Sequence, residues 1–89
     1  MSKIVYKKIL PQYFDDVING HKDFELRKDE DDIQVGDRLV LNEFDGTNYT
    51  GQYIAKDVKY VLRNCSQYGL MDGYCIIGLS KTMVCRLNF

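Results

Sequence analysis

The residues best suited to chemistry in this 89-residue chain lie in one stretch, from Gly20 to Lys28, with the sequence Gly-His-Lys-Asp-Phe-Glu-Leu-Arg-Lys. Lysine and arginine bind phosphate or carboxylate, and arginine does so through parallel N–H groups. A glutamate beside them accepts hydrogen bonds, orients the cations or moves a proton. The stretch therefore predicts either an anion-binding site or a site for acid–base chemistry.

The geometry of this site depends on where a strand begins. Side chains alternate between the two faces of a strand. Lys22 and Glu25 are three positions apart, so they converge only if the chain bends or if Lys22 lies in the loop that follows Gly20. On a regular strand the shared charged face would consist of His21, Asp23, Glu25 and Arg27.

The composition indicates one globular domain over residues 1–89. The chain is 45% hydrophobic and 28% charged, and its net charge of −1 argues against a strongly basic nucleic-acid-binding protein, although a local basic patch remains possible. No apolar run approaches the roughly 20 residues of a membrane helix, and the N-terminus has no signal-peptide pattern. We therefore expect a cytoplasmic protein that does not contact a membrane.

The cysteines and acidic residues do not predict a metal site, and no cofactor is expected. The three cysteines lack a C-x-x-C spacing and are far in sequence from His21, so free thiols are the simplest interpretation, with one disulfide left open. The acidic run 29–32 lacks the ligand spacing of a calcium loop and is expected to be a solvated turn.

The order of elements predicts a mostly β fold. A strand over 4–10 is followed by Pro11 and a short helix over 12–19, whose stripe of Phe14, Val17 and Ile18 should face a core. Gly20 is the expected C-terminal cap. Further strands are predicted at 23–28, 38–44, 49–62 and 73–79.

The connections and the tail complete this prediction. A hairpin turn is expected at 45–48, and a bulge or bend in the long strand at Gly51 or at Lys56-Asp57. Residues 64–72 form a loop with room for a helical turn near Leu70, and the tail 80–89 is a last strand or a docked extension. We expect a small curled or barrel-like α+β sheet of five to six strands, with one short helix after the first strand, because closing a sheet hides its edges.

The stretch Gly20-x-Lys22-x-x-Glu25-x-Arg27 resembles the signature of ASCH domains, which belong to the PUA-like group. More closely, the chain resembles the small bacterial and phage family DUF3850 over residues 4 to about 79. The blocks that carry this second resemblance are Pro11-x-Tyr13-Phe14, Gly20 to Lys28, Val35-Gly36-Asp37-x-Leu39, Glu43-Phe44-Asp45, Tyr49-Thr50-Gly51 and Gly69-Leu70-x-x-Gly73-Tyr74.

The resemblance implies a PUA-like β-barrel with the signature lining a cleft, and a role in binding RNA or a nucleotide. Lys22 and Arg27 would contact phosphate, and Glu25 would accept from a base or orient the cations. The chain departs from the family at 29–31, where acidic residues replace a basic one. Candidate stacking faces are Tyr13, Tyr68 and Tyr74.

Two other functions are compatible with the sequence. ASCH-like amidohydrolases that deacylate acetylated cytidine resemble the chain less closely, because Lys22 matches their lysine but Glu25 stands where they carry a threonine. In such an enzyme Lys22 would be the base or nucleophile, Glu25 would transfer protons and Arg27 would stabilise an oxyanion. The third possibility is a phage or bacterial partner-binding protein whose site is unrelated to the signature.

Overall fold

The computed structural model describes residues 2–87, with the backbone alone for 82–87. The predicted mostly β fold, with one short helix after the first strand, is confirmed. The elements of the described chain are β1 (Ile4–Ile9), α1 (Pro11–Ile18), β2 (Phe24–Lys28), β3 (Arg38–Phe44), β4 (Tyr49–Leu62), the 3-10 turn η1 (Ser66–Tyr68) and β5 (Tyr74–Leu87).

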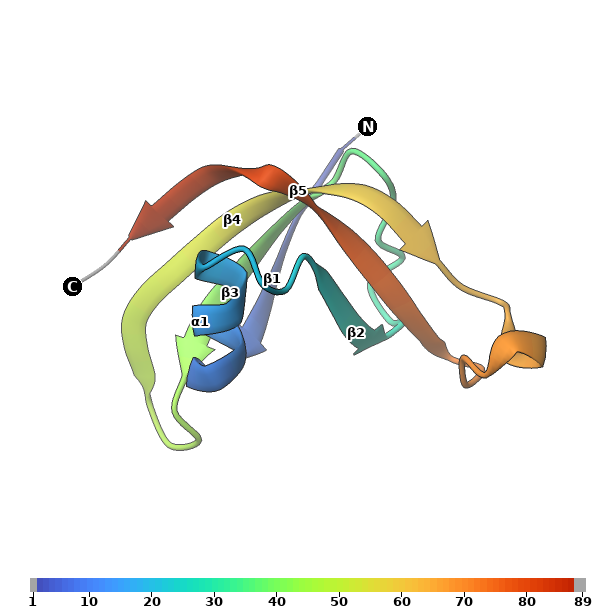
Figure 1. Ribbon diagram of the computed structural model, residues 1–89, viewed down its shortest axis with the longest axis horizontal. Coiled ribbons are helices and arrows are strands. Elements are labelled where there is room, and N and C mark those ends of the chain that lie inside the picture. The colour runs from blue at the N-terminus through green and yellow to red at the C-terminus, as the bar shows by residue number, and fades with distance from the viewer. Residues whose placement is uncertain (1, 88–89) are drawn as a thin grey trace.

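The strands form one five-stranded sheet that curls into a half-barrel, in the order β1-β3-β4-β5-β2 (Figure 1). β1 and β3 are parallel, and the other neighbouring strands are antiparallel. The two edges of the sheet are therefore β1 and β2, which are separated in sequence only by α1 and the turn that follows it.

The core lies between α1 and the inner face of the sheet. Phe14 and Val17 are each 1% exposed, and Ile18 packs against the same cluster, so the predicted helical stripe is confirmed. The alternation of β3 adds Leu39 and Leu41 to this cluster. Since an eight-residue helix is marginal alone, α1 depends on this packing.

The long strand β4 is irregular at both predicted positions. Gly51 has a φ of 92°, a left-handed conformation that glycine adopts without steric cost. The pairing of β4 with β5 shifts register between Ala55 and Tyr60, around the predicted bulge at Lys56-Asp57. Lys56 is buried there, and burial lowers the pKa of its ammonium.

The tail continues the strand that precedes it. β5 passes the predicted end at Leu79 and reaches Leu87, so residues 80–87 belong to the same strand, whereas 88–89 lie outside the described residues. Within the predicted loop 64–72, the helical turn is η1 and lies before Leu70. Cys65 and Cys75 are buried free thiols, as expected, and the side chain of Cys85 is outside the described part.

The acidic turn after β2 differs from the predicted solvated loop, because its carboxylates are paired. Asp29 accepts hydrogen bonds from Arg63 at 2.5 and 3.0 Å. Glu30 and Asp31 both contact the ammonium of Lys7, and the hydrogen bond from Asp31 raises the pKa of Lys7. The turn thus neutralises cations of neighbouring strands, a role that local sequence did not indicate.

Asp37 is buried directly before β3, where its carboxylate bonds to Lys3 and Gln34. It accepts from the backbone N–H and the ammonium of Lys3, at 3.0 and 2.9 Å, and from the N–H of Gln34 at 2.8 Å. The Lys3 ammonium is the main cause that lowers the pKa of Asp37 from 3.8 to about 2.

We expect the stability of the fold to fall between about pH 4 and pH 2, partly because of Asp37. Since the folded-state pKa is lower than the unfolded value of 3.8, the carboxylate stabilises the fold fully above that value and loses its contribution as the pH falls toward 2. Urea titrations across this range should show a shallower decline for Asp37→Asn than for the wild type. Equal slopes would contradict the assignment.

Candidate functional site

Lys22 lies in the turn between α1 and β2, not on the strand. The backbone N–H groups of His21 and Lys22 both donate to the carbonyl of Asp16, at 2.9 and 3.0 Å, and Gly20 has a φ of 76°. These bonds hold the chain against the end of α1, and β2 begins only at Phe24. Because Lys22 precedes the strand, the alternation of side chains does not direct it to the opposite face, and its side chain reaches Glu25.

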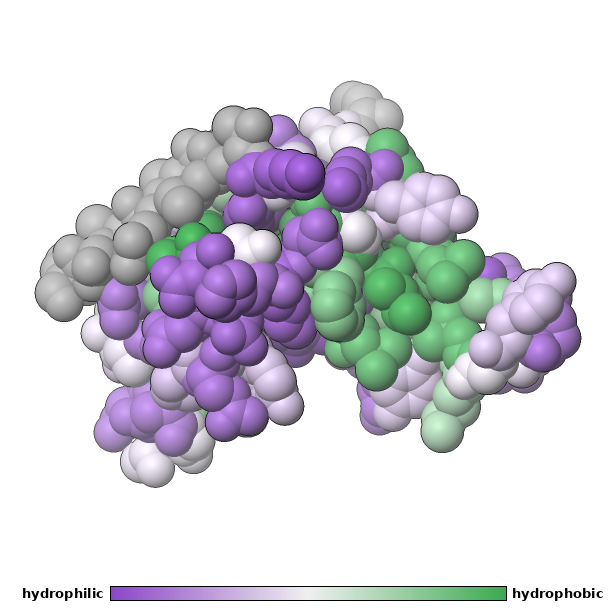
Figure 2. Space-filling model, in the orientation of Figure 1, coloured by the Kyte–Doolittle hydropathy of each residue, from purple (hydrophilic) through white to green (hydrophobic). Residues whose placement is uncertain are grey.

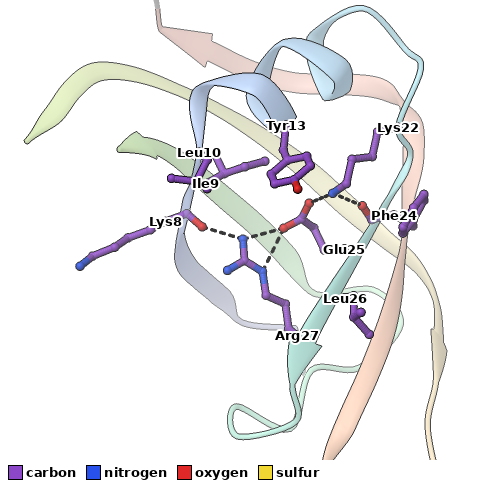
Figure 3. A pocket seen from close by; sticks show the side chains of 9 residues that line it. All are labelled: Lys8, Ile9, Leu10, Tyr13, Lys22, Phe24, Glu25, Leu26 and Arg27. Atoms are coloured by element: carbon purple, nitrogen blue, oxygen red, sulfur yellow. Dashed lines mark hydrogen bonds and ion pairs between the residues drawn. The ribbon is translucent and has the colours of Figure 1, made fainter. Parts of the chain in front are cut away.

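Glu25 lies at the floor of the site and joins two cations. Its side chain points to the inner face of β2, and the residue is only 3% exposed. One carboxylate oxygen, Oε2, contacts the Lys22 ammonium, and the other, Oε1, accepts from Arg27 Nε at 2.9 Å and Nη2 at 2.6 Å (Figure 3). Lys22, Glu25 and Arg27 thus form one continuous ion-pair network.

The same network bridges the two edges of the sheet. Arg27 Nη2 also donates to the backbone carbonyl of Lys8, at the end of β1, at 2.6 Å. We name the space between Lys8–Ile9 of β1 and Phe24–Arg27 of β2 the seam. It contains a pocket of about 350 Å³, lined by Lys8, Ile9, Leu10, Tyr13, Lys22, Phe24, Glu25, Leu26 and Arg27 (Figure 3).

Aromatic rings flank the cation at the mouth of the pocket. The Lys22 ammonium lies 5.6 Å from the centre of the Tyr13 ring and 5.0 Å from that of Phe24. Both distances are within the range of cation–π attraction. Tyr13 is 43% exposed, so its ring has free surface on which a planar group can stack.

Two donors of the network have no partner among the described residues. The Lys22 ammonium has three N–H groups and uses two of them, on Glu25 and on the carbonyl of Phe24. Arg27 Nη1 has no hydrogen bond to any residue in the described range 2–87. With two cations and one carboxylate, the network carries a net positive charge and is suited to an anion.

The structure brings together most of the residues predicted for the site. Lys22, Glu25, Arg27 and Tyr13 line one pocket. Tyr74 does not line it, because Tyr74 begins β5 opposite Lys28. Tyr68 lies in η1, in the loop before β5, and His21 is exposed in the turn.

The residues missed by sequence reasoning contribute backbone or apolar surface. Lys8 supplies its carbonyl, whereas its ammonium lies 4.5 Å from the Phe44 ring centre. Leu10 and Ile9 form part of the wall. No sequence signal marks such groups, because every residue has a carbonyl and their position depends on the curl of the sheet.

Among the described residues, no three His, Cys, Asp or Glu side chains are grouped closely enough to hold a metal ion. Across the same residues, no helix has the length and apolar character that crossing a bilayer requires.

Comparison with known families gives one assignment. The family model of a domain of unknown function, DUF3850, matches residues 6–79, a range that includes α1, β2 and every residue that lines the pocket. No curated protein matches the chain.

Proposed function

The chain belongs to the DUF3850 family, and we propose that it binds a nucleotide, either free or as one unpaired nucleotide of RNA. The observation that carries this proposal is the convergence of Lys22 and Arg27 on one pocket, each with an unused N–H group. The motif from Gly20 to Arg27 and the curled sheet support a place among the ASCH domains of the PUA-like group.

The phosphate would contact the two cations on the sides that the Glu25 carboxylate does not occupy. Arg27 Nη1 and the third N–H of Lys22 are the donors available to its oxygens, and Glu25 holds both side chains in place. A preorganised pair of this kind avoids the entropy of ordering long side chains at the moment of binding.

The base would lie against the ring of Tyr13. A pocket of about 350 Å³ is near the small end of ligand sites, which span roughly 300–1,000 Å³, so it suits one nucleotide and not a folded nucleic acid. RNA would therefore be bound through a splayed, unpaired nucleotide, as is general for recognition of single-stranded RNA. Lys7 and Arg63 pair with three of the four carboxylates of the acidic turn and so offset part of its negative charge.

We expect Lys22→Ala and Arg27→Gln each to weaken the binding of nucleoside monophosphates and of short single-stranded RNA about tenfold or more, since a charge-assisted hydrogen bond contributes about 1.5–3 kcal/mol. Isothermal titration at two salt concentrations measures this effect. Lys59→Ala, which removes an exposed lysine outside the pocket, is the matched control. An affinity that is the same in the wild type and in both site variants, and that does not depend on the salt concentration, would contradict the phosphate role.

A second candidate function, amidohydrolysis of an acylated nucleoside, is favoured by the contact between Lys22 and Glu25. However, both contacts of the Lys22 ammonium use it as a donor, whereas a base or nucleophile needs a free lone pair. Release of the acid from a panel of acylated nucleosides would establish the enzyme. Binding without turnover by the folded protein would leave the binding function alone.

A further inference from the structure

Alternate residues of β2 direct their backbone N–H and C=O groups away from β5, toward the free edge of the sheet. The N–H of Leu79 donates to the carbonyl of Asp23 at 2.8 Å, and the N–H of Asp29 donates to the carbonyl of Gly73 at 2.9 Å. In the register of β2 with β5, these bonds fix every second residue as a hydrogen-bonded pair. The backbone N–H and C=O groups of the intervening residues therefore point to the free edge. These residues are Phe24, Leu26 and Lys28.

The free edge of β2 faces the pocket. The carbonyl of Phe24 is already used, because it accepts from the Lys22 ammonium at 2.7 Å. The N–H and the C=O of Leu26 have no partner among residues 2–87. An unpaired donor and acceptor thus lie side by side at the wall of the pocket.

The side chain of Leu26 points away from the ion-pair network. It lies on the opposite side of β2 from Glu25 and Arg27 (Figure 3). On that outer face it is aligned with Ile76 of β5, which in turn is aligned with Leu62 of β4. Figure 2 shows apolar side chains gathered over this part of the sheet, beside the polar surface around α1.

We propose that the backbone N–H and C=O of Leu26 hydrogen-bond to the edge of the nucleobase, and so distinguish a nucleotide from other phosphates. This inference rests on the proposed nucleotide function. Every nucleobase presents a donor next to an acceptor on its Watson–Crick edge, and unstacked bases are recognised on that edge. The phosphate on Arg27 and Lys22 and the base on Leu26 would then belong to one ligand.

The length of the free edge favours a base over an added peptide strand. Strand addition needs a row of unpaired backbone groups along the edge. Here the edge is occupied on one side by the Lys22–Phe24 hydrogen bond, and Arg27 crosses the seam to Lys8 on the other. One residue's donor and acceptor remain between these two contacts, which matches a single planar edge.

Leu26→Pro tests the inference, since proline lacks the backbone N–H, keeps the C=O and is tolerated on edge strands where the N–H faces outward. Leu26→Ala, which keeps the N–H, is the matched control. The probes are AMP, CMP, GMP and UMP, with ribose 5-phosphate as the ligand that has no base. We expect Leu26→Pro to bind the tightest nucleotide about tenfold more weakly than Leu26→Ala does, and the two variants to bind ribose 5-phosphate equally.

The other outcomes of this experiment distinguish failure of the proposed Leu26 contact from failure of the proposed nucleotide binding. If ribose 5-phosphate binds the wild type as tightly as the nucleotides do, or if Leu26→Pro loses nothing, the role of Leu26 is wrong and the phosphate site stands. If neither class of ligand binds, the proposed function itself is wrong. Binding of an extended acidic peptide that is lost in Leu26→Pro, without nucleotide binding, would also overturn the inference.

A measurement on the wild type covers the case in which Leu26→Pro fails to fold. In an amide NMR titration with the tightest nucleotide, the Leu26 N–H resonance should shift strongly, and the same titration with ribose 5-phosphate should leave it in place. An unmoved Leu26 resonance in a protein saturated with nucleotide would overturn the inference.

Discussion

Replacing Glu25 with alanine should lower the free energy of unfolding by about 3 kcal/mol, because it leaves two partly buried cations without their carboxylate. Glu25 is 3% exposed, and the side chains of Lys22 and Arg27 are themselves mostly covered. The loss should also loosen the link between Arg27 and the end of β1. Urea unfolding at neutral pH, with Arg27→Gln in parallel, measures the change.

Glu30→Ala is the control for this change. Glu30 also pairs with a lysine, but its side chain is 62% exposed, and an exposed ion pair contributes about 0–1 kcal/mol. If both variants lost less than about 1 kcal/mol, burial of Glu25 would not matter to the fold. The network would then serve the ligand alone.

Phe14→Ala should destabilise the domain by about 3–5 kcal/mol, the usual cost of removing a fully buried aromatic side chain. Phe14 is 1% exposed and is, with Val17, one of the residues by which α1 is held in the core. Because a helix of eight residues does not persist alone, its detachment should also remove one wall of the pocket. Thermal unfolding and far-UV circular dichroism report both effects.

Tyr13→Ala is the matched variant on the same helix. Its ring is 43% exposed, so we expect a change in stability within about 1 kcal/mol. Nucleotide binding should nevertheless weaken, since a stacked base contributes about 1–3 kcal/mol. A Tyr13→Ala protein that keeps full affinity would exclude stacking at this position.

Much of the fold could be predicted from the sequence, because several of its elements are determined by short local patterns. The stripe on α1, the glycine cap at Gly20 and the alternation of β3 each depend on residues within a few positions. The end predicted at Leu79 is wrong because the strand is maintained by pairing with the irregular part of β4, a non-local contact. The paired acidic turn was missed for the same reason, since Asp29 and Arg63 are far apart in sequence.

Most of the candidate residues predicted from the sequence meet in one pocket, but their geometry was not predictable. The signature identified Lys22, Glu25 and Arg27, and Glu25 and Arg27 share a face as alternation requires. Lys22 joins them because two hydrogen bonds to Asp16 delay the start of the strand, which no strand pattern reveals. The free backbone edge at Leu26 follows only from knowing that β2 is an edge strand.

The seam leaves this half-barrel with a circumference that backbone pairing does not fix. In a barrel closed by continuous backbone pairing, strand number and shear fix the diameter. Here β1 and β2 are joined in the described structure by side chains, through Arg27 to Lys8 and through the contacts of Lys7 with the acidic turn. Widening the opening to admit a larger group would exchange a few side-chain contacts and leave every ladder hydrogen bond intact.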